Sequence, residues 1–251
     1  MLREKTVFGP IKSRRLGSSL GINLLPEEGK FCNFDCIYCE CGWNKDGTGD
    51  RRLPTREEVR TALEDKLSEL LLEGTAIDSI TFSGDGESTL HPEFPQIIDD
   101  VIALRNIYYP DAKISVLSNA TRVYVDSVFE ALCKVDRAIM KIDAPTNELI
   151  AKINRPAPGY DVARVVEGLK RFNGKFVLQT MFLRSDDFDS SDPAVIEGWM
   201  QIVRDIHPRK TMVYSIDRPT PQEGLRKFSK EEMEALVAPL VEEGYNIWVF
   251  A

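Results

Sequence analysis

The sequence is poor in cysteine and histidine, with five residues of the first type and two of the second among 251. It has no apolar run long enough to span a bilayer, and its first residues, MLREKTVFGP, lack the apolar core of a secretory signal peptide. We therefore expect a cytoplasmic protein with no membrane attachment. In that reducing compartment an odd number of cysteines argues against a disulfide framework and for metal or redox chemistry.

The overall composition is that of an ordinary globular protein. Glycine and proline are not enriched enough to indicate disorder, and 43% of the residues are hydrophobic. The formal net charge of −8 argues mildly against a broad nucleic-acid-binding surface, although a local basic patch is compatible with it. Charge therefore leaves the class of partner open.

Short β-branched or apolar runs alternate with longer amphipathic stretches along most of the chain. The predicted strands are Leu20–Leu25, Ser79–Ser83, Lys113–Leu117, Ala138–Ile142, Phe176–Phe182 and Thr211–Ile216, with Asn246–Phe250 as an extra strand. The predicted helices are Thr55–Leu72, Glu93–Arg105, Tyr124–Cys133, Asp161–Phe172, Pro193–Ile206 and Lys230–Glu243. This alternation predicts an α/β protein in which helices cover a parallel sheet.

Local signals mark the ends of some of these helices. Thr55 with Glu58, and Ser229 with Glu232, have the spacing of a capping box. We predict one domain over residues 1–251, with an N-terminal extension at 1–18 and a C-terminal strand at 244–251. The alternation does not decide whether the sheet closes as a barrel, stays partly open or lies flat, but each arrangement puts its chemistry at the carboxyl ends of the strands.

Four of the five cysteines lie between positions 32 and 41, in KFCNFDCIYCECGW. Cys32, Cys36 and Cys39 have the spacing C-x3-C-x2-C, and three thiolates on one loop suit three corners of an iron–sulfur cube. The fourth iron is then open to a ligand from outside the protein. The alternative is a structural zinc site completed by Cys41, although Cys39 and Cys41 are cramped neighbours for one ion. Cys133, at the end of a helical pattern, is expected to be a small core residue.

The segment CNFDCIYC resembles the cysteine loop of the radical S-adenosylmethionine (SAM) superfamily, with Tyr38 at its aromatic position. The resemblance implies a [4Fe-4S] cluster held by Cys32, Cys36 and Cys39, and SAM as cosubstrate on the open iron. In that superfamily an electron from the cluster cleaves SAM to methionine and a deoxyadenosyl radical, which takes hydrogen from a substrate. With this resemblance we predict a partial (β/α)6 TIM-like barrel with its helices outside.

Later strand ends carry residues that the resemblance assigns to SAM. Gly84, Gly86 and Glu87 follow the second predicted strand in a segment similar to a Gly-Gly-Glu motif, with Asp85 inserted. Such a glycine-rich turn is also compatible with a purely structural role. After the third strand, Ser118 and Asn119 are placed to contact the ribose or carboxylate of SAM, and the alternative is that Asn119 caps a turn.

The next two strands end in further polar residues. Lys141 and Asp143 alternate with Ile142 onto one face, and charges inside a barrel are costly unless they pair or meet a polar ligand. We interpret them as catalytic pocket residues, with a structural ion pair as the alternative. Gln179 on the fifth strand is a further expected SAM contact.

A longer stretch, FGPIKSRRLGSSLGINLLPEEGKFCNFDCIYCE, together with YSIDRPTP, resembles the Fe–S oxidoreductases related to the tRNA wyosine-base synthase. The resemblance implies an enzyme that acts on a substrate still to be identified, with RNA, a base or a small molecule as candidates. The alternative is an activase that generates a glycyl radical on a partner protein. Either enzyme needs an external electron donor of the flavodoxin or ferredoxin type, and tRNA or a protein is a candidate partner.

Overall fold

The computed structural model of the chain describes residues 5–47, 49 and 51–250. The predicted N-terminal extension and C-terminal strand also include residues 1–4 and 251, which lie outside the described residues. The chain packs into two compact units: one comprises Met1–Cys32, Asn44–Ser118 and Val125–Ala138, and the other Asn33–Trp43, Asn119–Tyr124 and Ile139–Ala251. This division does not test the expectation of one domain, which stays a prediction.

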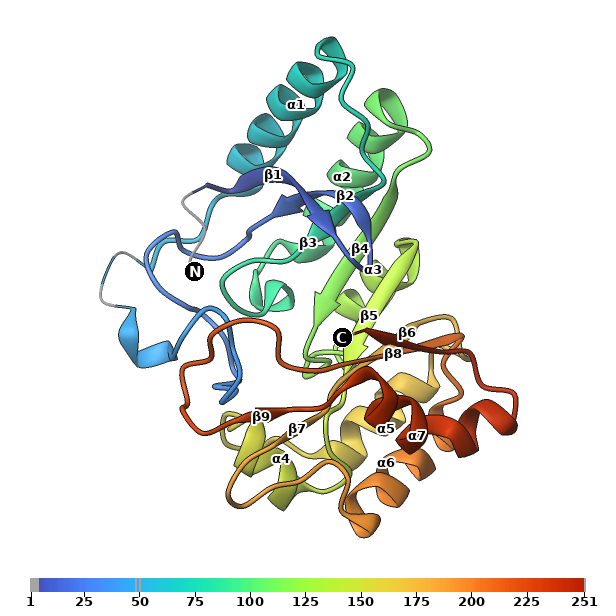
Figure 1. The fold of residues 1–251 in the computed structure, drawn as a ribbon. Helices are drawn as coiled ribbons and strands as arrows, with labels where there is room; N and C mark the ends of the chain where they lie inside the picture. The colour runs from blue at the N-terminus through green and yellow to red at the C-terminus, as the bar shows by residue number, and fades with distance from the viewer. Residues whose placement is uncertain (1–4, 48, 50, 251) are drawn as a thin grey trace. The chain divides into compact units, whose positions relative to one another are not determined.

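The strands of the first unit follow the spatial order β1-β2-β3-β4 (Figure 1). Their bounds are β1 Val7–Ser13, β2 Gly17–Ile22, β3 Ser79–Phe82 and β4 Lys113–Ser118. β1 and β2 form an antiparallel hairpin, and β2, β3 and β4 are parallel. The predicted N-terminal extension therefore supplies an edge strand.

The helices of the first unit follow its strands along the chain and pack on one another. They are α1 Arg56–Leu72, α2 Phe94–Tyr108 and α3 Asp126–Lys134, with short 3-10 turns η1 Asn44–Asp46 and η2 Ser88–Leu90. α1 packs against α2, and α2 against α3. The predicted capping box is confirmed: the Thr55 side chain accepts from the Glu58 amide, and the Glu58 side chain accepts from the amide of Thr55.

The strands of the second unit follow the order β5-β6-β8-β10 and are parallel where their register is defined. Their bounds are β5 Arg137–Lys141, which begins at the end of the first unit, β6 Val177–Met181, β8 Lys210–Tyr214 and β10 Ile247–Phe250. Two short strands, β7 Leu183–Arg184 and β9 Arg226–Lys227, pair separately. The helices are α4 Asn147–Ile153, α5 Val162–Lys170, α6 Pro193–Ile206 and α7 Lys230–Glu242.

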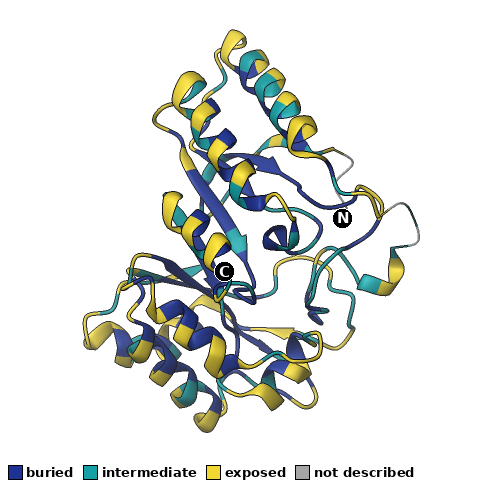
Figure 2. Ribbon diagram, turned by 180° about the vertical axis from the view of Figure 1, so that it is seen from behind, coloured by how far each residue is buried: buried dark blue, intermediate teal, exposed yellow. Residues whose placement is uncertain are grey.

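Helices and strands both contribute to the core, and each long helix buries only one face. β3 and β6 are buried at every position, as expected for parallel strands covered by helices. Figure 2 shows helices exposed along one side, and the inner parallel strands mostly buried. Within the described residues, no helix is both long and apolar enough to cross a bilayer.

The sequence predicted the repeating elements better than the short ones. Strand–helix repeats run from β2–α1 to β8–α7 and end in β10, which confirms the α/β class and the extra C-terminal strand. β1, α4, β7 and β9 were not predicted, because they are short or lie outside the repeat. The expectation for Cys133 is wrong: the residue is exposed, since it falls on the outer face of α3.

One ion pair ties α1 to α2 and provides a test of this packing. Arg56 Nε and Nη2 donate to Asp100 Oδ2 and Oδ1 over 2.6 and 2.8 Å. The hydrogen bond from Arg56, opposed by partial burial, holds the pKa of Asp100 below its usual value. A carboxyl with a depressed folded-state pKa stabilises the fold above its unfolded pKa, and loses that contribution as pH falls through the folded one.

We therefore expect Asp100→Asn to lower the free energy of unfolding near neutral pH. The difference from the unsubstituted protein should shrink as pH falls below the ordinary carboxyl pKa of 3.8. Urea unfolding across a pH series measures both quantities. Glu69→Gln, in the exposed pair with Lys66, is the control and should change little. A pH-independent loss for Asp100→Asn would contradict this account.

Candidate active site

The cysteine loop is held in the second unit by the carboxyl end of α4. The amides of Asp35 and Ile37 donate to the carbonyls of Asn154 and Ile153, each over 2.9 Å, and the Ala157 amide donates back to Asn33 over 2.8 Å. The last carbonyls of a helix lack partners within the helix, so they are available to a neighbouring segment. Backbone hydrogen bonds to residues 153–157 therefore hold the loop in place.

Cys36 and Cys39 stand at the two ends of one turn. The Cys39 amide donates to the Cys36 carbonyl over 3.1 Å, which brings their backbones close. Cys36 is buried and Cys39 is half-buried. Burial, reinforced by the nearby Cys39, raises the pKa of the Cys36 thiol to about 11, although a hydrogen bond from Asn154 acts in the opposite direction.

Beside this thiol lies a buried polar cluster, which we define as Tyr38, Lys141, Asp143, Asn154 and Tyr214. Asn154 Nδ2 lies 3.4 Å from Cys36 Sγ, 2.8 Å from the Tyr38 hydroxyl and 2.8 Å from Asp143 Oδ2. The Tyr38 hydroxyl in turn donates to Asp143 Oδ2. The amide of Asn154 thus joins a predicted cluster ligand to the predicted catalytic carboxylate.

Lys141 completes the polar cluster from β5. Its Nζ donates to Asp143 Oδ1 over 3.2 Å and to the Tyr214 hydroxyl over 2.7 Å. It also lies 5.0 Å from the ring centres of both Tyr38 and Tyr214, a distance typical of cation–π attraction. Lys141 and Asp143 therefore share one face, as their alternation predicts, and they form an ion pair.

Electrostatics fix the protonation of two members of the polar cluster. Burial alone would lower the pKa of Lys141, but the charge of Asp143 and the phenol of Tyr214 outweigh it and raise that pKa. Burial, together with Asp143, raises the pKa of Tyr38 well above its usual value. Lys141 is therefore an ammonium and Tyr38 a neutral phenol over the physiological range.

Gln179 lies next to Lys141 in the register of β5 and β6. The residue is buried, and its carbonyl accepts from the Ile142 amide over 3.3 Å. Its predicted contact with SAM stays a prediction.

In the first unit, the glycine-rich turn is packed tightly against the segment that precedes the cysteines. A Cβ on Gly86 would lie 1.9 Å from the carbonyl oxygen of Phe31, and one on Gly84 would lie 2.0 Å from Asn23 Oδ1. The inserted Asp85 is fully buried; its amide donates to Asn23 Oδ1 over 3.2 Å, and Asn23 Nδ2 donates to its carboxylate over 3.3 Å. The glycines thus allow close backbone approach inside the protein.

The structure brings two predicted SAM contacts together in this unit. Ser118 Oγ donates to Glu87 Oε1 over 2.9 Å, and both side chains are buried. The same carboxylate oxygen accepts from the amide and the hydroxyl of Thr89, so Glu87 also caps η2. Glu87 therefore has a structural role whether or not it meets a cosubstrate.

Asn119 belongs to a closed ring of three hydrogen bonds in the second unit. Asn119 Nδ2 donates to Asn33 Oδ1, Asn33 Nδ2 donates to Thr121 Oγ1, and Thr121 Oγ1 donates to Asn119 Oδ1, each over 2.7 Å. The Thr121 amide also donates to Asn119 Oδ1. This is the geometry of a side chain that caps a turn, which is the structural alternative for Asn119. The ring fixes the first residue after Cys32.

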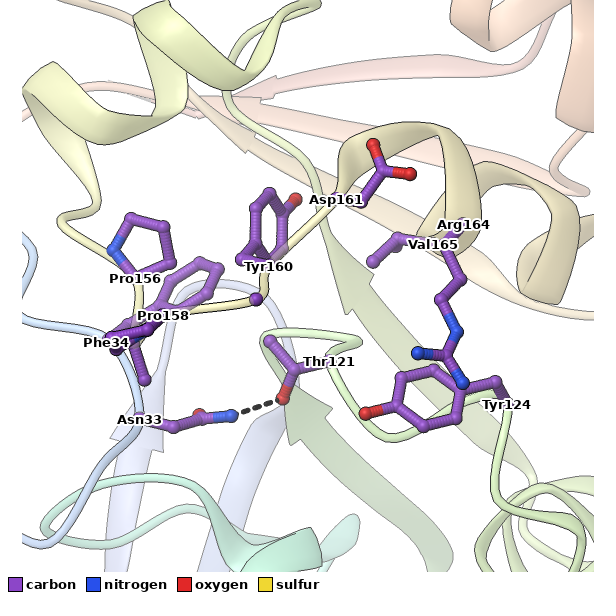
Figure 3. A pocket seen from close by; sticks show the side chains of 12 residues that line it. Asn33, Phe34, Thr121, Tyr124, Pro156, Pro158, Tyr160, Asp161, Arg164 and Val165 are labelled. Atoms are coloured by element: carbon purple, nitrogen blue, oxygen red, sulfur yellow. Dashed lines mark hydrogen bonds between the residues drawn. The ribbon is translucent and has the colours of Figure 1, made fainter.

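A small cavity of about 90 Å³ lies against this ring. Figure 3 shows the Asn33–Thr121 bond at its edge, the Tyr160 ring on one wall and Arg164 over the Tyr124 ring, with 3.7 Å from guanidinium carbon to ring centre. Pockets that enclose whole ligands are typically about 300 Å³ or larger. We assign this cavity no ligand.

Sequence reasoning missed the residues that connect the predicted ones. No sequence motif marks Asn154, Asn33 or Thr121, and Tyr214 lies only within the resembling segment YSIDRPTP. Thr146 is the N-cap of α4, and apolar residues follow at helical spacing, so this signal could have found the helix that ends at Asn154. The contacts of Asn154 carried no sequence signal.

Comparison with known proteins decides the family. The profile of the Radical SAM superfamily matches residues 29–188, which include the cysteine loop and the strands from β3 to β7. The chain belongs to the radical SAM superfamily. The resemblance of the cysteine loop is thereby confirmed, and the chain is an enzyme of this superfamily, whose substrate this match does not identify.

Curated relatives of this radical SAM protein match it over most of its length. It is 30% identical to "GTPase Obg" of Brachyspira hyodysenteriae over 93% of this chain, but it spans only 33% of that protein. It is also 30% identical to "UPF0026 protein MJ1312" of Methanocaldococcus jannaschii, over 92% of this chain and 70% of the relative.

Solved structures share its fold at low sequence identity. A radical SAM methyltransferase from Sphaerobacter thermophilus has a TM-score of 0.68 at 13% identity, covering 92% of this chain and 65% of its own. SuiB of Streptococcus suis bound to S-adenosylmethionine has a TM-score of 0.60 at 11% identity, and the match covers 92% of this chain and 47% of SuiB. Archaeal TYW1 has a TM-score of 0.52 at 11% identity, and the match covers 89% of this chain and 71% of TYW1. The predicted fold class, a partial (β/α)6 TIM-like barrel, is confirmed.

The superfamily implies a [4Fe-4S] cluster and SAM, and the thiols of the second unit fit such a cluster. Burial and the proximity of Cys39 both oppose a bare thiolate at Cys36, so a bound cation is what would let both sulfurs ionise. Cys32 belongs to the first unit, where its amide donates to Asn44 Oδ1 over 3.2 Å. Among the described residues, no three His, Cys, Asp or Glu side chains are gathered as a metal site, and the three-cysteine ligand set stays a prediction.

The glycine turn provides a test of its packing. Gly86→Ala should destabilise the fold by roughly 3 kcal/mol or more, because a positive φ and a clash with Phe31 act together. Gly74→Ala is the matched control: its φ is also positive, but no atom lies within 4 Å of the added Cβ. That variant should lose about 1–2 kcal/mol. Equal losses in urea unfolding would rule out the clash.

Proposed function

We propose that this enzyme uses a [4Fe-4S] cluster, held by Cys32, Cys36 and Cys39, to cleave SAM reductively and to take hydrogen from a substrate. One observation carries the proposal: the superfamily profile encloses the cysteine loop, and the buried Cys36 of that loop adjoins the polar cluster that contains Lys141. RNA, a nucleic-acid base or a small molecule is the proposed substrate class.

When bound, the cluster and SAM supply one-electron cleavage of the sulfonium and a carbon radical that removes hydrogen. The chain's own groups orient the reactants. Lys141 Nζ, kept protonated by Asp143, offers a positive hydrogen-bond donor toward substrate and cannot act as a base. Asp143 holds Lys141, while the neutral phenol of Tyr38, which belongs to the cysteine loop, donates to the same carboxylate.

The SAM contacts that we propose come from the predicted set. They are Tyr38, Gly84, Gly86, Glu87, Ser118, Asn119 and Gln179. The burial of Glu87, Ser118 and Gln179 supports this proposal, because buried polar groups beside a ligand give strong and directional contacts. Their hydrogen bonds within the protein preorganise them.

We further propose a cytoplasmic location and an external electron donor of the flavodoxin or ferredoxin type. A cluster that must be reduced before each cleavage requires a reducing compartment and a partner that delivers electrons. A glycyl-radical activase is the alternative raised by the sequence, and no described contact favours it over the proposal above.

The ligand assignment is tested by replacing the three cysteines with alanine. The triple variant, reconstituted anaerobically, should lose iron retention and deoxyadenosine formation together, because no corner of the cube remains held. Cys41→Ala is the control from the same loop and should retain both. Iron analysis and chromatography of the products measure them. Retention of either property by the triple variant would overturn the assignment, and loss of metal in Cys41→Ala would instead favour a four-cysteine site.

The role of Lys141 is tested by Lys141→Ala. Turnover should fall well over tenfold while SAM binding is retained, because we place the ammonium toward substrate. Equilibrium dialysis with SAM and the rate of deoxyadenosine release separate the two effects. Lys170→Ala, which removes an exposed ion pair with Glu167, is the matched control. A rate within about threefold of the parent, roughly 0.6 kcal/mol, would refute the assignment.

A further inference from the structure

The side-chain amide of Asn154 occupies an unusual place between a thiol and a carboxylate. Asn154 caps the carboxyl end of α4 and is 1% exposed. Its Nδ2 faces three acceptors at once: Cys36 Sγ at 3.4 Å, the Tyr38 hydroxyl at 2.8 Å and Asp143 Oδ2 at 2.8 Å. Two N–H groups therefore serve three acceptors, and the sulfur is one of them.

The orientation of this amide is dictated by its neighbours. The Asp143 carboxylate already accepts hydrogen bonds from Lys141, Tyr38 and the backbone amide of Met181. Its oxygens therefore act as acceptors, and the atom of Asn154 that faces them must be the nitrogen. The opposite orientation would set the carbonyl oxygen of Asn154 against the sulfur and the carboxylate. In the observed orientation Asn154 Oδ1 is buried and has no hydrogen-bond partner among the described residues. An unpartnered buried acceptor is costly, so the contacts on the nitrogen side outweigh that cost.

The backbone of the same residue holds the loop as well. The Asn154 carbonyl accepts from the Asp35 amide over 2.9 Å, one residue before Cys36. A single residue thus fixes the loop backbone and directs an N–H group at the sulfur that follows. Hydrogen bonds to a ligating sulfur stabilise its negative charge and so raise the reduction potential of an iron–sulfur cluster.

We propose that Asn154 is a positioning residue for the cluster: its amide holds Cys36 Sγ and raises the reduction potential of the bound [4Fe-4S] group. This inference rests on the proposed function. Through Asp143 the same amide is connected to Lys141, so the cluster ligand and the group directed at substrate share one hydrogen-bonded support.

The experiment compares anaerobically reconstituted Asn154→Ala and Asn154→Leu with the unsubstituted enzyme. Asn154→Leu nearly preserves side-chain volume, so it stays informative where the cavity left by alanine is not tolerated. Asn147→Ala is the control on the same helix, because Asn147 also uses its side chain, with Asp161 and the Val162 amide, but is not among the residues around Cys36. Circular dichroism reports folding, and redox titration followed by electron paramagnetic resonance reports the midpoint potential.

We expect both Asn154 variants to fold and to show a midpoint potential more negative than that of Asn147→Ala and of the unsubstituted enzyme. Loss of iron from folded Asn154 variants, with retention in Asn147→Ala, would also support the holding role. Unchanged iron content and potential in either folded Asn154 variant would overturn this inference and leave the proposed function standing. Failure of the unsubstituted enzyme to assemble a four-iron cluster would instead remove the proposed function itself.

Discussion

The second unit depends on supplying hydrogen-bond donors to one carboxylate that has no access to water. The side chain of Asp143 is fully buried, and burying a charge is expensive unless donors replace its hydration. Those donors are Lys141, Tyr38, Asn154 and the backbone amide of Met181. They come from β5, the cysteine loop, the end of α4 and β6. Satisfying this single charge therefore fixes the relative positions of all four segments.

In the first unit, backbone hydrogen bonds hold the segment that precedes the cysteines. The segment before the cysteines runs so close to the turn after β3 that only glycine fits at positions 84 and 86. The Phe31 amide donates to the Asp85 carbonyl over 2.8 Å, and the Glu87 amide donates to the Phe31 carbonyl over 3.2 Å. Asn23 and Asp85 satisfy each other beneath this contact. The chain that leads into the cysteine loop is thus anchored before it reaches Cys32.

These two anchors hold the backbone of the cysteine loop, although the loop has no regular secondary structure of its own. A metal-binding loop gains affinity and a defined geometry when its backbone is held before the metal arrives. The radical chemistry belongs to the superfamily, whereas the ammonium of Lys141 and its phenol neighbour Tyr214 are the groups that we propose to face the substrate. Their buried hydrogen bonds make the position of that charge a property of the whole second unit.

The sequence by itself determined the features that depend on near neighbours along the chain. The C-x3-C-x2-C spacing, the alternation of strands and helices, the two capping boxes and the shared face of Lys141 and Asp143 all follow from local geometry. Tertiary structure alone decided that the amide of Asn154 meets a sulfur 118 positions away, and that Asn119 closes a ring with Asn33 across 86 positions. Side chains that far apart in the sequence meet only because the end of α4 and the turn after β4 both contact the cysteine loop. A local sequence pattern cannot predict these long-range contacts, because the energy that stabilises them comes from buried partners far away in the sequence.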